Sequence, residues 1–208
     1  MSEPVTSPSM RQRVSTDRLI LRRWREADRE PFAALNADPA VTEYLQGQMT
    51  WEASDAFVDR IEAQWDAAGW GLWAVEVPGV SDFIGYVGLW PADYVFGTPM
   101  VEVGWRLAHA HWGNGYATEA AREALRFGFE EVGLEEVVSF TVPQNVRSRR
   151  VMERIGLVRD PADDFDHPRV DPPAYPQLVR HVLYRISRTR WTESDSLPIS
   201  HPVTASRD

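Results

Sequence analysis

One stretch in the middle of the chain constrains the fold more than any other. Residues 101–108 alternate between apolar and polar positions as a strand does, Gly113 and Gly115 follow, and apolar residues from Ala117 to Val132 recur at helical spacing. Glycines let backbone N–H groups converge without a Cβ in the way, and the unpaired amides at a helix start favour an anion. The stretch therefore predicts a strand, an anion-binding loop and a helix in succession. A tight turn without a ligand is the alternative interpretation.

The same patterns extend this unit over most of the chain and predict a mixed α/β domain of the α+β class. Strands are predicted at 16–22, 71–77, 82–90, 101–108 and 137–142, from Val158 onward and at 181–186. Helices are predicted at 26–36, 51–68, 114–132 and 145–155. Gly156 follows the last helix where glycine commonly ends one, and Pro78-Gly79 joins two strands as a hairpin. This order implies a mixed, mostly antiparallel twisted sheet of about seven strands, flanked by helices.

The predicted domain covers residues 14–188. Residues 1–13 are rich in Ser, Pro and Thr and predict a disordered tail, and residues 189–208 predict a second one. The N-terminus lacks the apolar segment of a secretion signal, and no run of roughly 18 apolar residues could span a membrane. These observations predict a cytoplasmic protein of one domain that does not contact membranes.

The chain contains neither cysteine nor lysine, so all 22 of its basic residues are arginine. Disulfides, thiolate metal sites and cysteine nucleophiles are therefore excluded, as are Schiff-base chemistry and a P-loop lysine. The net charge of −9 disfavours nucleic acid as a partner. It suits a cationic partner such as an amine, although a charge that only keeps the protein soluble is the alternative.

Three segments, in the expected order, resemble motifs of the GNAT superfamily of N-acetyltransferases. Residues 102–105 (EVGW) and 112–120 (WGNGYATEA) resemble its acetyl-CoA-binding motif, and residues 145–157 resemble the motif that follows. Residues 16–22 are similar to the opening strand of the ribosomal-protein alanine N-acetyltransferase branch. Two further segments are similar to one bacterial subgroup of that branch: 164–168 and 181–185. The resemblance implies a GNAT-like sheet splayed between strands 4 and 5, with acetyl-CoA as cosubstrate and no metal.

The resemblance also implies how the coenzyme would be held. Its pyrophosphate would be bound by the backbone amides of Gly113, Asn114, Gly115, Tyr116, Ala117 and Thr118. The strand that carries Trp105 and Leu107 would pair with the pantetheine arm, and Asn145 would hydrogen-bond that arm from across the gap between strands. Ala110 departs from the family pattern, which often has Arg or Gln there, so no side-chain contact to the phosphates is expected from this position.

Acetyl transfer to an amine requires a neutral nitrogen, because α-amino groups have a pKa of about 8 and lysine side chains one of about 10.4. Glu102, in the strand beside the expected thioester, is the leading candidate for the base that removes the proton. Strict alternation places Glu102 on the face opposite Trp105, so a bulge or a water molecule would have to connect it to the reaction. A solvated or ion-paired strand residue is the alternative interpretation.

Two further residues are candidates for proton transfer. Ser148 is the candidate acid for the departing thiolate, and hydrogen bonding within the first turn of its helix is the alternative role. His167 is a second candidate base, because an imidazole beside the carboxylate of Asp166 could titrate near neutral pH. It lies in loop 160–177, which would cover the acceptor site, unless that loop is simply solvated.

The leading hypothesis for function is an N-acetyltransferase that acts on a protein N-terminus or a small-molecule amine. A non-catalytic acyl-CoA sensor and an enzyme that uses a larger donor such as succinyl-CoA are the alternatives. His109 and His111 alone make a poor metal site. Arg147, Arg149 and Arg150 reach either the coenzyme phosphates or only solvent. A homodimer is compatible with the sequence.

Overall fold

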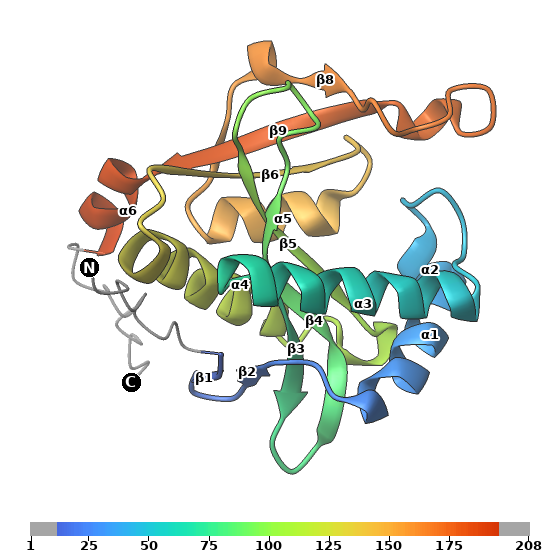
Figure 1. Ribbon diagram of the computed structural model, residues 1–208. Coiled ribbons are helices and arrows are strands. Elements are labelled where there is room, and N and C mark those ends of the chain that lie inside the picture. Colours follow the sequence, from blue (N-terminus) through green and yellow to red (C-terminus); the bar gives the residue numbers. More distant parts are fainter. Residues whose placement is uncertain (1–11, 196–208) are drawn as a thin grey trace, which may run out of the picture.

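The computed structural model describes residues 12–195, so most of both predicted tails lies outside the described residues. Within that range the chain forms one nine-stranded sheet with helices on both faces (Figure 1). The strands are β1 (Val14–Ser15), β2 (Ile20–Arg22), β3 (Leu72–Val77), β4 (Ser81–Pro91), β5 (Val101–Leu107), β6 (Glu136–Thr141), β7 (Val158–Arg159), β8 (Phe165–Asp166) and β9 (Arg180–Ser187). The helices are α1 (Arg29–Ala37), α2 (Pro39–Thr42), α3 (Trp51–Ala68), α4 (Tyr116–Phe127), α5 (Val146–Arg154) and α6 (Arg188–Asp195).

The strand order confirms the predicted α+β class. The sheet runs β1-β2-β3-β4-β5-β6-β9-β7, and β8 pairs with β9 outside this path. Neighbouring strands are antiparallel except for β5 and β6, which are parallel. None of the helices formed by residues 12–195 has the length and apolar character needed to cross a membrane.

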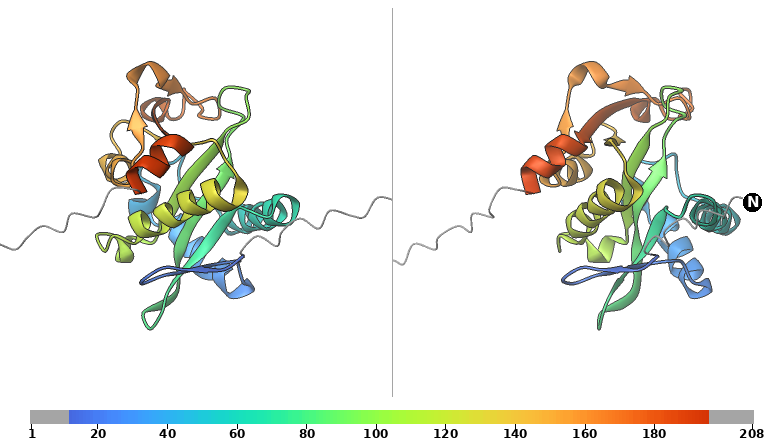
Figure 2. Two further views of the ribbon diagram at one scale, coloured as in Figure 1. Left: turned by 90° about the vertical axis from the view of Figure 1, so that its left-hand side faces the viewer. Right: turned by 60° about the vertical axis from the view of Figure 1, so that its left-hand side comes forward.

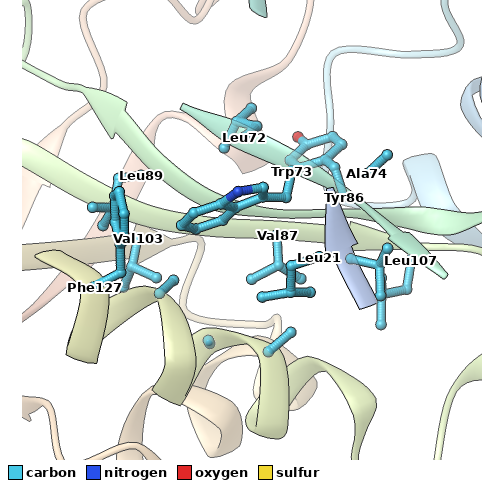
Figure 3. Close-up of a cluster of buried hydrophobic side chains, with 14 of the residues drawn as sticks. Leu21, Leu72, Trp73, Ala74, Tyr86, Val87, Leu89, Val103, Leu107 and Phe127 are labelled. Atoms are coloured by element: carbon cyan, nitrogen blue, oxygen red, sulfur yellow. The ribbon is translucent and has the colours of Figure 1, made fainter. Parts of the chain in front are cut away.

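Alternation along the central strands divides the molecule into two layers around the sheet. Helices α1 and α3 cover one face, and α4 covers the other (Figure 2). Val87, Val103 and Leu107 point toward α4, whereas Tyr86 points to the opposite face (Figure 3). Val87 and Val103 are fully buried, and removing such apolar side chains from water is the main stabilising contribution to the fold.

Local signals set the ends of the elements that border the site. The Thr50 hydroxyl caps α3 by accepting a hydrogen bond from the Ala53 amide at 3.2 Å, and Gly69 ends this helix with φ of +75°. The predicted hairpin of β3 and β4 is confirmed, with Gly79 in its turn at φ of +75°. The two elements meet through Trp65 of α3 and Trp73 of β3, whose rings lie 5.2 Å apart.

Strands β5 and β6 separate after one point of contact. β4 and β5 pair at seven positions, but β5 and β6 pair only at Glu102 and Val138. β6 instead forms six register pairs with β9. The sheet therefore opens between β5 and β6, which are the fourth and fifth strands of the sequence prediction, and the predicted splay is confirmed.

Some boundaries differ from the predictions for local reasons. The first strand is interrupted between β1 and β2, because the Thr16 amide and hydroxyl both bond to the backbone of Leu19 in a turn. The strand count is nine rather than about seven, because the short strands β1 and β8 add to the sheet. Helix α4 begins at Tyr116, after the loop glycines. The packed domain continues past residue 188, because Trp191 of α6 lies 5.7 Å from the Phe129 ring.

Candidate active site

A cavity of about 690 Å³ lies where β5 and β6 separate, and residues from both faces of the sheet line it. Along β5, Glu102, Gly104 and Arg106 face the α3 side, and Trp105 and Leu107 face the α4 side. No bulge interrupts the pairing of β5 with β4. Glu102 and Trp105 therefore lie on opposite faces of the sheet, as predicted. Both nevertheless line the same cavity, because it extends to both faces.

The loop before α4 has the backbone geometry that an anion site requires. Gly113 and Gly115 have φ of +79° and +81°, a region that residues with a side chain rarely adopt. Gly115 is the N-cap residue and offers no side chain to the first amides of α4. Those amides lack acceptors within the helix, and the helix dipole adds positive potential there. All three features suit a bound phosphate group.

Arg18 supports this loop from outside, a contact that the sequence analysis missed. Its guanidinium donates to the Asn114 carbonyl at 2.9 Å and pairs with Glu119 at 2.6 Å. The Thr16 hydroxyl also donates to Glu119, which lowers the pKa of that carboxyl together with the bonds from Arg18. Because Arg18 is distant in sequence from the loop, no local pattern indicated the contact.

The edge of β5 beside the gap has backbone groups without a partner strand beyond Glu102. This is the edge along which an extended ligand such as a pantetheine arm can pair. The carbonyl of Leu107 already accepts a hydrogen bond from the Trp112 indole at 2.8 Å. One lone pair of this carbonyl is thus already used, and the other remains for a ligand.

Asn145 caps α5 on the other side of the gap. Its side-chain oxygen accepts from the Ser148 amide at 3.2 Å, and its Nδ2 donates to the Thr141 hydroxyl at 3.1 Å. One N–H of the Asn145 amide remains for a ligand. The Ser148 hydroxyl lines the cavity and bonds to no other residue in the described range, so the predicted alternative of a bond within the helix turn is not observed.

The arginines of α5 do not behave as one group. Arg147 lies over the Trp112 ring at 4.6 Å and pairs with Glu43 at 2.9 Å, and both Arg147 and Arg150 line the cavity. Arg149 instead donates to the Tyr184 hydroxyl at 3.2 Å. Two of the three are therefore placed to meet an anionic ligand.

Glu102 is the one acidic residue lining the cavity within the described chain. Its carboxyl has no hydrogen bond or ion pair with any residue between 12 and 195, and burial raises its pKa to about 8. The pKa of Tyr94 is raised to about 12, first by burial and then by the nearby carboxyl of Glu102. Glu102 is thus a partly buried carboxyl that is mostly protonated at neutral pH.

Aromatic side chains line the same cavity as Glu102, and three of them, Tyr86, Trp90 and Tyr94, lie near its side chain or backbone; we call this part the acceptor end of the cavity. This end comprises Phe57, Tyr86, Trp90, Tyr94, Phe140, His167 and His181. Phe57 lies 5.9 Å from Tyr86 and 6.1 Å from Trp90, ring centre to ring centre. Tyr94 lies 5.8 Å from His167. Tyr94 belongs to no motif, and His181 opens the segment 181–185 without any role assigned to it, so neither was predicted as a site residue.

His167 lies at the acceptor end, but its predicted partner does not. The Asp166 carboxylate forms an ion pair with the Arg180 guanidinium at 3.3 Å. The His167 ring instead packs against the His181 ring, with 4.7 Å between the ring centres. Burial, followed by the neighbouring His181 and Arg169, lowers the pKa of His167 to about 4. The prediction that His167 titrates near neutral pH beside Asp166 is therefore wrong, because the carboxylate that would stabilise the charged ring lies elsewhere.

Loop 160–177 is attached to the domain rather than only solvated. Gln46 donates to the Arg169 carbonyl at 2.9 Å and accepts from the Asp171 amide at 3.1 Å. The Arg169 guanidinium lies 3.5 Å from the centre of the Tyr94 ring. These contacts hold His167 against the cavity.

The histidines before the glycine loop have other contacts. The His109 ring packs on Trp112 at 4.8 Å, and His111 lines the cavity. Across residues 12–195 the structure contains no cluster of three or more His, Asp or Glu side chains that could hold a metal ion.

Comparison with known proteins agrees with this geometry. Residues 18–158 match the family model of the acetyltransferase (GNAT) domain. The uncharacterised protein YkkB of Bacillus subtilis (strain 168) is 34% identical over 146 residues, which cover 70% of this chain and 84% of YkkB. The FsC-acetyl coenzyme A-N(2)-transacetylase of Aspergillus fumigatus is 37% identical over 133 residues, which cover 57% of this chain and 54% of that enzyme.

Solved structures show the same fold. A GNAT-family acetyltransferase from Bacillus anthracis has a TM-score of 0.71 at 26% identity, covering 85% of this chain and 99% of its own. A Vibrio cholerae protein proposed to be a ribosomal-protein-serine acetyltransferase has a TM-score of 0.64 at 16% identity, covering 84% of this chain and 97% of its own, which shows a shared fold alone. The family predicted from the motifs is thus confirmed: this chain belongs to the GNAT family and is an N-acetyltransferase that uses acetyl-CoA.

Proposed function

We propose that the enzyme transfers the acetyl group of acetyl-CoA to a primary amine by direct attack of the amine on the thioester. The observation that carries this proposal is the cavity between β5 and β6, which joins an anion-binding loop on one face of the sheet to a buried carboxyl on the other. The acceptor is a small-molecule amine or a protein N-terminus, the latter as in the ribosomal-protein alanine N-acetyltransferase branch.

The coenzyme is proposed to occupy the α4 side of the cavity. The amides of Gly113, Asn114, Gly115, Tyr116, Ala117 and Thr118 would bind the pyrophosphate. The free edge of β5 at Trp105 and Leu107, together with the remaining N–H of Asn145, would bind the pantetheine arm. The thioester would then lie in the gap, within reach of an amine on the other face.

Proton transfer is assigned to Glu102 and Ser148. In the reaction the amine nitrogen bonds to the carbonyl carbon, the C–S bond breaks, and one proton moves from nitrogen to sulfur. An ammonium ion that enters beside Glu102 favours the carboxylate form, which then accepts the additional proton of the ammonium, directly or through water, and leaves the neutral amine that attacks the thioester. Ser148 would donate to the departing sulfur. His167 is the second candidate base, and its lowered pKa means that it is present as the neutral imidazole.

Ser148→Ala tests the proposed acid. We expect kcat to fall by about 10²-fold, since general acid catalysis commonly contributes at least this much. The affinity for coenzyme should change little, and a donor with a better leaving thiol should recover part of the rate. The measurement is kcat with both donors, with the exposed Ser15→Ala variant as control. An unchanged kcat would remove Ser148 from the mechanism.

Release of free thiol from acetyl-CoA on addition of an amine tests the function itself. The chain has no cysteine, so all thiol detected comes from the coenzyme. We expect release to require an amine. A rise in melting temperature with acetyl-CoA, but no release with any amine, would instead identify a sensor that only binds the coenzyme. Faster release from succinyl-CoA would identify a different donor.

A further inference from the structure

The walls of the acceptor end are aromatic to an extent that the transfer of an acetyl group does not require. Seven rings line it, and they contact one another as well as the cavity. Phe140 lies 5.8 Å from His167 and 6.0 Å from His181, so the aromatic lining extends from the tyrosines to residues of β6 and β9. Such walls recognise a flat apolar body by edge and face contacts.

The charged side chains at the acceptor end can accommodate one positively charged group of a ligand. Glu102 is the one acid that lines the cavity in the described chain, and the nearby cation Arg106 donates to Asn36 at 2.6 Å beneath Tyr86. His167 is held in one tautomer, because its Nδ1 accepts a hydrogen bond from the Arg169 amide at 3.2 Å. A second ammonium group in the same ligand would lose its water and find no carboxylate.

We propose that the acceptor is a primary amine with a single positive charge carried on a flat aromatic body, and that this end of the cavity excludes polyamines and other polycations. The inference rests on the proposed function, since it names the substrate class of the same site. The amine would lie at Glu102, where ammonium and ring faces attract each other, and its aromatic body would pack against the wall that Tyr94 and the two histidines form together.

The experiment compares 2-phenylethylamine, ethylamine and spermidine by kcat/KM and, in parallel, by calorimetric binding to the CoA-bound protein. Burial of one phenyl ring predicts a preference for 2-phenylethylamine over ethylamine of roughly 30- to 100-fold, and spermidine should be the weakest ligand. Tyr94→Leu should reduce the rate with 2-phenylethylamine more than the rate with ethylamine. Phe96→Leu is the matched control, because the Phe96 ring is 46% exposed and does not line the cavity.

The two readouts separate failure of this inference from failure of the proposed function. Spermidine binding as tightly as 2-phenylethylamine, or an equal effect of Tyr94→Leu on both monoamines, would overturn the aromatic acceptor. The expected order of binding without any release of thiol would support the recognition argued here and contradict amine acetylation.

Discussion

Glu102→Gln is expected to have opposite effects on catalysis and stability. Turnover at neutral pH should fall by about 10²–10⁴-fold, because the amide keeps the shape of the side chain but cannot accept the proton of the amine. The loss should shrink at high pH, where the free amine is already neutral. At pH 8 the same variant should unfold at a higher temperature than the wild type, because a carboxyl with a raised pKa destabilises the folded state there.

The direction of the stability effect follows from the pKa. Burial raises the pKa of Glu102 from 4.5 to about 8. Below pH 4.5 the carboxyl is protonated in both the folded and the unfolded chain, and its contribution to stability is fully present. Between 4.5 and about 8 the unfolded chain ionises first, so the free energy of unfolding falls as pH rises. Because the carboxyl is open to a cavity that water can enter, we expect a loss of about 2–4 kcal/mol by pH 8.

The test measures the thermal unfolding temperature and kcat of the wild type and the variants from pH 4.5 to 9. Glu102→Gln should remove the decline in stability assigned to this carboxyl, whereas the matched change at the exposed Glu30, in α1, should leave both the decline and the activity as in the wild type. Wild-type turnover in Glu102→Gln across neutral pH would place the base elsewhere, and His167 would be the next residue to change.

Gly115→Val should weaken coenzyme binding by at least about 100-fold. The branched side chain would occupy the space in front of the first amides of α4, and the loss of two hydrogen bonds to a charged phosphate corresponds to a factor of this size or larger. A Cβ at Gly115 would also lie 3.4 Å from the Arg18 guanidinium that supports the loop. Calorimetry with acetyl-CoA measures the affinity.

Strain must be separated from the loss of the site. Gly115 has φ of +81°, so valine there destabilises the fold by about 1–3 kcal/mol whatever the ligand. Gly79→Val is the matched control: Gly79 has φ of +75°, a Cβ there meets no atom within 4 Å, and the residue does not line the cavity. It should share the loss of stability and keep the coenzyme affinity. Equal affinities of the two variants would show that the loop at Gly115 is only a turn.

Much of the backbone that borders the α4 side of the cavity could be predicted from the sequence because its signals are local. The loop glycines lie where the backbone needs positive φ, and Asn145 lies one residue before α5, where a cap belongs. The alternation of β5 also placed Glu102 and Trp105 on opposite faces. The same alternation, carried two residues further from Gly104, could have identified Arg106 as a neighbour of the site.

The sequence by itself determined the order of the elements and the position of the glycine loop before α4, because periodicity, glycine conformation and helix capping depend on residues a few positions apart, and its motifs identified the family by resemblance. Only the tertiary structure decided which side chains meet at the acceptor end. Tyr94, His167 and His181 come together because β8 and β9 return beside β6, and no local pattern encodes that approach. Burial then decided the chemistry: it raises the pKa of Glu102 and lowers that of His167, and burial is a property of the assembled fold.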